Sequence, residues 1–206
     1  MARLAKPRLI MTVGHSTRPL EEFIALLRAH GVKKLIDVRT IPRSRHNPQF
    51  NAETLPAGLR PAGISYIHLK KLGGLRHPRA DSPNTGWRNA SFRVYADYMQ
   101  TEEFREGLEG LIKLAAKKPS AIMCAEAVPW RCHRSLIADA LKAKRIPVAH
   151  ILSPARIQPH ALTPFIRVSR GRITYPETKT QAELNFDALA NKAPRKRKAS
   201  RGHPAG

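Results

Sequence analysis

The stretch "LIMTVGHSTRPLEEFIALLRAHGVKKLIDV", residues 9–38, decides the fold because it reads as strand, helix and strand in succession. The apolar run at 8–13 stops at "GHST", which is typical of a buried strand. Pro19 and the pair Glu21–Glu22 favour a helix start, apolar residues then follow at helical spacing, and "HG" at 30–31 ends the helix. A second buried strand is predicted at 34–38.

The same alternation continues along the chain. Further strands are predicted at 64–69, 120–124 and 147–152, with one more short strand at 172–176, and helices at 90–100, 102–117 and 132–144. Residues 40–62 and 70–89 are rich in loop-forming residues. We therefore predict an α/β fold with a mainly parallel sheet of about five strands and helices on both faces, in Rossmann-like layers. Residues 1–176 form one domain, and 177–206 form a polar, basic tail that we expect to be disordered.

The charge is strongly positive. Thirty-seven Lys and Arg against fifteen Asp and Glu give a net charge of +22, and residues 191–206 hold only six of the bases. Such a chain attracts polyanions, so nucleic acid or a phosphate-bearing ligand is the expected partner, with simple solubility as the alternative. The basic residues of the tail that could bind nucleic acid are Arg195, Lys196, Arg197 and Lys198.

The sequence gives no reason to expect a membrane. No apolar run approaches the roughly 18–20 residues of a membrane span. The two cysteines lack a disulfide-dense pattern, which suits a reducing compartment, and we expect a cytoplasmic protein. No cofactor is assigned.

Titratable and cationic residues follow almost every predicted strand. Because the carboxyl ends of parallel strands meet at one edge of a sheet, these residues are expected to converge on a functional cleft. Each of them taken alone has the alternative role of an ordinary turn residue. The candidates are His15, Ser16, Asp37, Arg39, Ser44, His68, Gly73, Gly74, Cys124, Glu126 and His150.

The segment "CAEAVPWRCHR", residues 124–134, holds both cysteines of the chain. If the next helix begins near 130–132, Cys132 lies in its first turn, where the helix dipole lowers the pKa of a thiol. Arg131, His133 and Arg134 act in the same direction. Cys124, at the strand end, is expected to be more buried and less polarised.

Four interpretations of this segment stay open. Cys132 is a nucleophilic or redox thiol, with Cys124 as its resolving partner. The arginines and the helix N-terminus bind an anion while the sulfurs only pack. Both cysteines are small buried hydrophobic residues. A metal site using Cys124, Cys132 and His133 is the fourth, but the spacing C-x7-C-H matches no common zinc motif and we expect none.

Several motifs in the same order resemble one family. They are "TVGHSTRPLEEFIALLRAHGVKKLIDVRTIPRSRHNPQF", "YIHLKKLGG", "FRVYADYM", "CAEAVPWRCHRSLIADAL" and "VAHI", between residues 9 and 153. The chain is similar here to the bacterial and archaeal domain of unknown function 488 family. The resemblance implies an α/β domain with a Cys/His/Arg cluster, and the DNA-repair labels of some members are only a hint. The matching residues are His15, Ser16, Asp37, Arg39, Pro42, Ser44, His68, Leu72, Gly73, Gly74, Cys124, Glu126, Cys132, His133 and Arg134.

Three functional hypotheses follow. In the first, the protein is an enzyme that acts on a phosphate-bearing or nucleic-acid substrate. Its catalytic candidates are Cys132, Cys124, Glu126, His133 and Asp37, and its anion-binding candidates are His15, Ser16, Arg39, Ser44, His68, Gly73, Gly74 and Arg134. In the second, it is a non-catalytic nucleic-acid-binding accessory protein in which aromatics such as Trp87 and Trp130 stack on bases, although most aromatics are expected in the core. In the third, it is a thiol-redox protein.

Overall fold

The structure, a computed structural model, describes residues 9–177. The predicted basic tail, with Arg195, Lys196, Arg197 and Lys198, falls almost wholly outside these described residues. Within residues 9–177, no helix has the length and apolar composition that crossing a membrane requires.

One six-stranded sheet forms the centre of the molecule. Its strands are β1 (Ile10–Gly14), β2 (Lys34–Asp37), β3 (Ser65–His68), β4 (Ser120–Cys124), β5 (Val148–Ser153) and β6 (Arg156–Pro159). They lie in the order β3-β2-β4-β1-β5-β6, and every neighbouring pair is parallel except β5 and β6. The predicted α/β class and mainly parallel sheet are confirmed.

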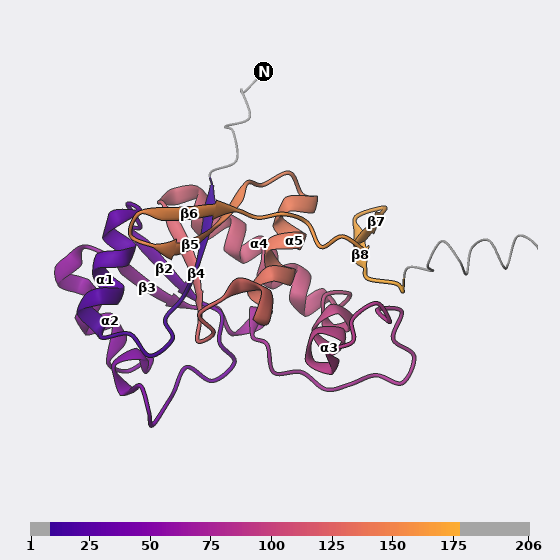
Figure 1. Ribbon diagram of the computed structural model, residues 1–206, viewed down its shortest axis with the longest axis horizontal. Coiled ribbons are helices and arrows are strands. Elements are labelled where there is room, and N and C mark those ends of the chain that lie inside the picture. Colours follow the sequence, from indigo (N-terminus) through magenta and orange to yellow (C-terminus); the bar gives the residue numbers. More distant parts are fainter. Residues whose placement is uncertain (1–8, 178–206) are drawn as a thin grey trace, which may run out of the picture.

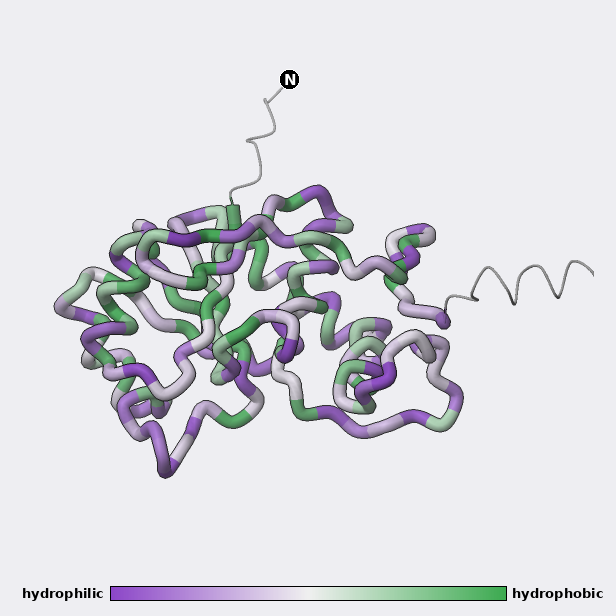
Figure 2. Tube along the Cα trace, viewed as in Figure 1, coloured by the Kyte–Doolittle hydropathy of each residue, from purple (hydrophilic) through white to green (hydrophobic). Residues whose placement is uncertain are grey.

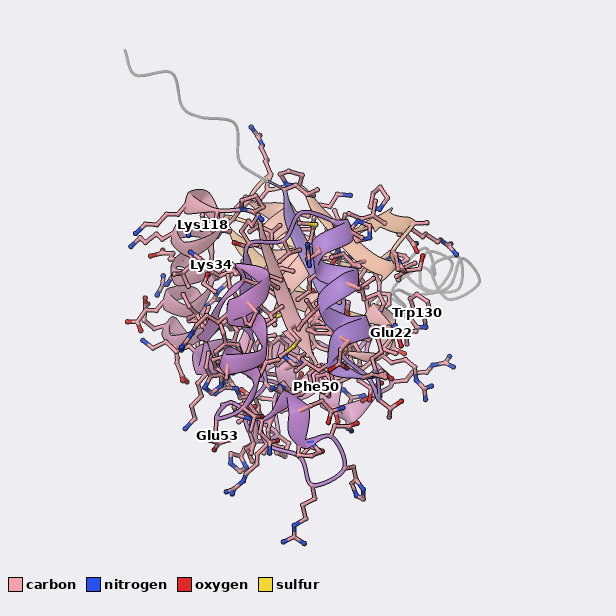
Figure 3. The ribbon with its side chains drawn as sticks, turned by 90° about the vertical axis from the view of Figure 1, so that its left-hand side faces the viewer. Glu22, Lys34, Phe50, Glu53, Lys118 and Trp130 are labelled. Atoms are coloured by element: carbon pink, nitrogen blue, oxygen red, sulfur yellow. The ribbon has the colours of Figure 1, made fainter. Side chains whose placement is uncertain are left out.

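Helices cover both faces of this sheet (Figure 1). They are α1 (Leu20–Ala29), α2 (Leu55–Leu59), α3 (Ala90–Tyr98), α4 (Glu102–Lys117) and α5 (Arg134–Ala143). Alternate residues of each strand point to opposite faces, so Leu35 packs in the core under α1 and α2 whereas Ile36 packs in the core under α3, α4 and α5. Figure 3 shows α1 and α2 over the first face, and Figure 2 shows hydrophilic colouring along the outer loops.

The structure differs from the sequence-based expectation at the edges. β6 was not predicted, because its four residues are all exposed and carry no apolar periodicity. The strand predicted at 172–176 is β8 (Arg172–Thr174), which pairs with β7 (Arg167–Ser169) in a separate two-stranded sheet. The short helix α2 lies inside a stretch predicted to be loop. The last helix begins at Arg134, two residues later than predicted.

The centre of the sheet depends on a close approach of two backbones at Gly14. A Cβ atom at this position would lie 1.8 Å from the carbonyl oxygen of Glu126, so only glycine fits. Beyond the strand, the amides of His15 and Ser16 donate to the carbonyls of Cys124 and Ala125, at 3.0 and 2.9 Å. The segment after β1 is therefore paired with the segment after β4.

Replacing Gly14 by alanine tests this contact. The methyl group must displace backbone rather than a flexible side chain, so we expect Gly14→Ala to lower the free energy of unfolding by at least about 2 kcal/mol. The matched control is Gly110→Ala in α4, where the nearest atom to the new Cβ is 3.9 Å away. That control is expected to be neutral or stabilising. Urea denaturation of both variants measures the difference, and equal stabilities would contradict the proposed constraint.

Candidate functional site

The strand-end residues form two groups at the carboxyl edge of the sheet, one on each face. On the face covered by α1 and α2, Asp37 and Arg39 meet His15, which stacks on Phe50 with ring centroids 4.1 Å apart. On the face covered by α3, α4 and α5, the cysteines meet His133. The sheet edge thus gathers most of the predicted residues, but in two neighbouring sites.

Arg39 and Asp37 form a buried ion pair. Nε of Arg39 donates to Asp37 Oδ1 at 2.9 Å, and Nη2 donates to Asp37 Oδ2 and to the carbonyl of Phe50. Tyr66 donates its hydroxyl hydrogen to the same carboxylate at 2.8 Å. Asp37 is fully buried and its oxygens are occupied, so this carboxylate orients Arg39.

His15 provides a further hydrogen-bond partner for Arg39. Nη1 of Arg39 lies 3.2 Å from His15 Nε2, and a guanidinium can only donate, so Nε2 is the acceptor. The hydrogen of the imidazole is therefore on Nδ1, which donates to the carbonyl of Ser16 at 2.7 Å. Burial lowers the pKa of His15 to about 4, which keeps the ring neutral at pH 7.

Four of the five N–H groups of Arg39 now have partners, since Nη1 uses one hydrogen for His15. The remaining Nη1 hydrogen has no hydrogen-bond partner within residues 9–177. Arg39 also lines a cavity, described below. It is therefore a fixed donor at that cavity, although Asp37 offsets its charge.

The two cysteines and His133 form the second group. Nδ1 of His133 lies 3.7 Å from Sγ of Cys132 and 3.9 Å from Sγ of Cys124, and both thiols are free. Nε2 of His133 lies 3.1 Å from the carbonyl oxygen of Val38. A carbonyl oxygen only accepts, so the neutral ring carries its hydrogen on Nε2 and directs the lone pair of Nδ1 at the sulfurs.

The setting of Cys132 differs from the prediction in two respects. A 3-10 turn, Pro129–Arg131, precedes it, and Cys132 itself has extended backbone, so it lies before α5 and not in its first turn. Cys132 is also the more buried residue, with 3% of its surface exposed against 8% for Cys124. The reason for the first difference is that the 3-10 turn occupies Pro129–Arg131 and the helix begins only at Arg134.

The pKa of the Cys132 thiol is nevertheless well below its ordinary value. The main cause is a hydrogen bond from Cys124, and the positive charge of Arg134 adds to it. Donating that bond, together with burial, raises the pKa of Cys124. The direction agrees with the sequence-based expectation, but the partner sulfur and not the helix dipole is its chief cause.

Arg134 fixes the loop between the cysteines. Its side chain is 1% exposed, and Nη2 donates to the carbonyls of Glu126 and Ala127. Nη1 donates to Oγ1 of Thr12 at 3.3 Å, while Nε has no hydrogen-bond partner among the described residues. Arg134 thus acts as a brace for backbone.

A buried chain of hydrogen bonds leads on from Thr12. Its hydroxyl lies 2.8 Å from Nδ1 of His150, Nε2 of His150 lies 3.0 Å from Nδ1 of His160, and Nε2 of His160 lies 2.9 Å from Asp139. Because the chain starts at a guanidinium and ends at a carboxylate, every donor points from Arg134 toward Asp139. The carboxylate also accepts from Thr163 and Tyr175.

The remaining predicted residues have supporting contacts. Nε2 of His68 donates to the carbonyl of Arg39 at 2.8 Å, and the hydroxyl of Ser44 accepts from the amide of Asn47. A Cβ on Gly73 would lie 2.5 Å from Thr40, and one on Gly74 would lie 2.6 Å from Nδ1 of His133. The two glycines therefore let their loop approach protein groups closely.

Two cavities open beside this edge and share Glu126. One has a volume of about 460 Å³, and its lining includes His15, Ser16, Arg39, Arg43, Ser44 and Glu126. The other has a volume of about 330 Å³ and is lined by Trp87, Asn89, Phe92, Glu126, Trp130 and Arg131. Among these described residues, neither lining includes a cysteine.

Sequence reasoning missed the chain from Thr12 to Asp139, apart from noting His150. One signal was present: Asp139 interrupts the apolar run of a helix in which eight consecutive residues, Arg134 to Leu141, are buried. A charged residue is rarely fully buried unless it is paired. Asp139 therefore called for partners from other elements.

The buried histidine chain predicts a dependence of stability on pH. Burial lowers the pKa of His150 from 6.5 to about 4. Between these values the unfolded chain binds more protons at this residue than the folded chain does, so stability falls as the pH falls from 6.5 to 4. His150→Gln removes up to one proton from this difference and is expected to flatten the slope by up to about 1.4 kcal/mol per pH unit.

Urea denaturation at a series of pH values measures both slopes. Since the pKa of His15 is lowered to about the same value, the variant should keep a residual slope. The exposed His77 supplies the control, because His77→Gln should leave the slope unchanged. Identical slopes in wild type and His150→Gln would show that His150 is protonated equally in the folded and unfolded chains.

Comparison with known proteins gives one relationship. No curated protein and no solved structure matches the chain. The sequence model of a family described as Domain of unknown function DUF488 matches residues 19–141, well over half of the chain. That range includes β2, β3, β4, both cysteines, Glu126 and all six residues that line the second cavity. The chain therefore belongs to the DUF488 family, as its motifs indicated.

Proposed function

We propose that the protein is an enzyme that acts on a phosphate-bearing substrate with an aromatic base, either a nucleotide or a residue of a nucleic acid. The observation that carries this proposal is the position of Glu126, which lines both the cavity with Arg39 and Arg43 and the cavity with Trp130. A nucleotide also has a phosphate and an aromatic ring joined by a short sugar.

The larger cavity suits the phosphate. Arg43 is exposed. The loop 40–47 that carries it contains bases but no Asp or Glu, so no acidic residue of this loop neutralises its charge. Arg39 offers an oriented N–H, and the Ser44 hydroxyl lies in the same lining. Charge-assisted hydrogen bonds from guanidinium groups are strong and directional contacts to phosphate.

The smaller cavity suits the base. Trp130 is 63% exposed, which is unusual for so large an apolar side chain, and Figure 3 shows it at the periphery of the molecule. Trp87 packs against Phe92, Phe165 and Tyr175, which hold its ring in place, and it lines the cavity together with Trp130. Two aromatic rings that line one cavity, one of them exposed, offer a stacking surface for a base.

Glu126 would then act on the bond that joins the two parts. Its side chain is exposed, while its backbone carbonyl is held by Arg134 and packs on Gly14. An exposed carboxylate on a fixed backbone suits general acid–base catalysis. Asp37, also a catalytic candidate from sequence, is assigned a positioning role toward Arg39.

The strongly basic chain also suits a non-catalytic nucleic-acid-binding protein. The DNA-repair labels of some family members point to this alternative. The shared position of Glu126 favours the enzyme, because a carboxylate beside the phosphate cavity weakens binding of a polyanion. Its presence there is accounted for by a proton-transfer role.

Binding of AMP, adenosine and inorganic phosphate to the full chain tests the two cavities. Trp130→Ala should weaken AMP and adenosine about tenfold and leave phosphate unchanged, because it removes stacking. Arg43→Ala should weaken AMP and phosphate and leave adenosine unchanged. Arg167→Ala on β7, an exposed arginine on a different element, is the matched control. Isothermal titration calorimetry gives the constants, and equal effects of Trp130→Ala on all three ligands would refute the assignment.

Turnover separates the enzyme from the accessory protein. Glu126→Gln keeps the size of the side chain and should bind AMP within about twofold of wild type. It should lower the rate of product formation at least about 100-fold, because general acid–base catalysis is lost. Chromatography of mixed nucleotides and short oligonucleotides after incubation with each protein provides the measurement. Wild type that releases no product, or releases it no faster than Glu126→Gln, would favour the accessory protein.

A further inference from the structure

We propose that Cys124, Cys132 and His133 form a binding site for a thiophilic transition-metal ion, with zinc as the first candidate. The site goes beyond the proposed function and does not depend on it. Two sulfurs and one imidazole nitrogen are the donor set that zinc takes in proteins, and a three-ligand site leaves the fourth position open to water or a substrate atom.

The spacing of the donor atoms agrees with tetrahedral coordination. With Zn–S bonds of about 2.3 Å and a Zn–N bond of about 2.0–2.1 Å, tetrahedral angles place the ligand atoms roughly 3.6–3.8 Å apart. Nδ1 of His133 lies 3.7 and 3.9 Å from the two sulfurs, and all three atoms lie within 4.8 Å of one another. The two nitrogen–sulfur distances match the tetrahedral values, and the sulfur–sulfur distance exceeds its tetrahedral value by at most about 1 Å.

The imidazole is already in the state that ligation needs. Its Nε2–H donates to the carbonyl of Val38, so Nδ1 presents its lone pair to the sulfurs. Histidine ligands almost always donate their other ring N–H in this way, to a carbonyl or a carboxylate, which fixes the tautomer and the ring orientation. Tyr95 packs against the ring with centroids 5.0 Å apart and restrains it further.

The loop at Gly74 packs closely against the imidazole of His133 near Nδ1. Gly74 faces this atom, and a Cβ there would lie 2.6 Å from it. Nothing in the local backbone requires glycine, because Gly74 does not have a positive φ angle. The absence of a side chain is thus explained by close packing against the face of the His133 ring, since that Cβ would also lie 3.0 Å from Cε1 and Cγ.

The surrounding charge suits anionic sulfur. Arg134 holds the carbonyls of Glu126 and Ala127 inside the loop between the cysteines, so its positive charge is fixed at this loop. Binding of Zn²⁺ to the two cysteines forms two Zn–S bonds and one Zn–N bond, and any proton that a sulfur still carries passes to the buffer. No oxidant or reductant is needed.

Reduced full-length protein, stripped of metal with a chelator, provides the first test without any mutation. Titration with Co²⁺ should produce a thiolate-to-cobalt charge-transfer band and intense visible bands typical of tetrahedral cobalt, and both should saturate at about one ion per chain. Added Zn²⁺ should displace the cobalt and abolish the bands. Wild-type protein that shows no charge-transfer band with excess Co²⁺ would overturn the proposal.

Variants identify the ligands. Cys124→Ser, Cys132→Ser and His133→Gln should each weaken Zn²⁺ binding at least about 100-fold in a competition titration with a coloured chelator. His77→Gln is the control, because His77 is exposed and outside the site. Circular dichroism verifies that each variant is folded.

If a cysteine variant does not fold, Gly74→Ala provides an independent test. Its methyl group crowds Nδ1 of His133 and should weaken zinc binding without removing a donor. Unchanged zinc affinity in His133→Gln would exclude the imidazole as a ligand and overturn the site as proposed. The metal titrations use no nucleotide, so their failure leaves the proposed function standing, and failure of AMP binding leaves the metal site standing.

Discussion

The absence of a side chain at Gly14 is the constraint on which the carboxyl edge of this sheet depends. The carbonyl of Glu126 occupies the space that a Cβ would take, and the amides of His15 and Ser16 continue the pairing of β1 with the segment after β4. The loop that carries Glu126 is therefore fixed at its root by backbone contacts. Its side chains, in contrast, are free to face solvent and the two cavities.

Buried charge at this edge is tolerated because every charged group has a defined acceptor or donor. Arg39 is compensated directly by Asp37. Arg134 has no carboxylate in contact within the described residues; its link to Asp139 runs through a hydroxyl and two imidazoles. In such a chain each group polarises the next, and the direction of donation is set at its ends. This arrangement ties β1 and β5 to α5, so the brace on the Glu126 loop is anchored in the core.

The sequence predicted the elements whose signal is local. Continuous apolar runs revealed the five parallel strands, because a buried parallel strand is apolar on both faces. β6 and β7 are exposed and owe their position to pairing with a neighbour, which no local pattern encodes. The convergence of strand-end residues followed from topology alone. Their division between two faces did not, because it depends on which side of the sheet each residue points to at the strand end.

The cysteine segment shows the same limit. Its residues predicted an activated thiol, but the cause assumed was a helix start at Cys132. The turn at Pro129–Arg131 places the two sulfurs together instead, and it depends on long-range contacts such as that of Gly14. The spacing C-x7-C-H gave no metal prediction for the same reason, since common zinc spacings describe other loops.

One loop connects the two proposals. Cys124 and Cys132 stand at the two ends of residues 125–131, and Glu126 and Trp130 lie between them. An ion bound to both sulfurs would cross-link the two ends of this loop. Such a cross-link removes conformational freedom from all the residues between them. The ion would thereby restrict the carboxylate and the stacking ring without lining either cavity. A metal on one face of the sheet can in this way set the geometry of a substrate site that opens at its edge.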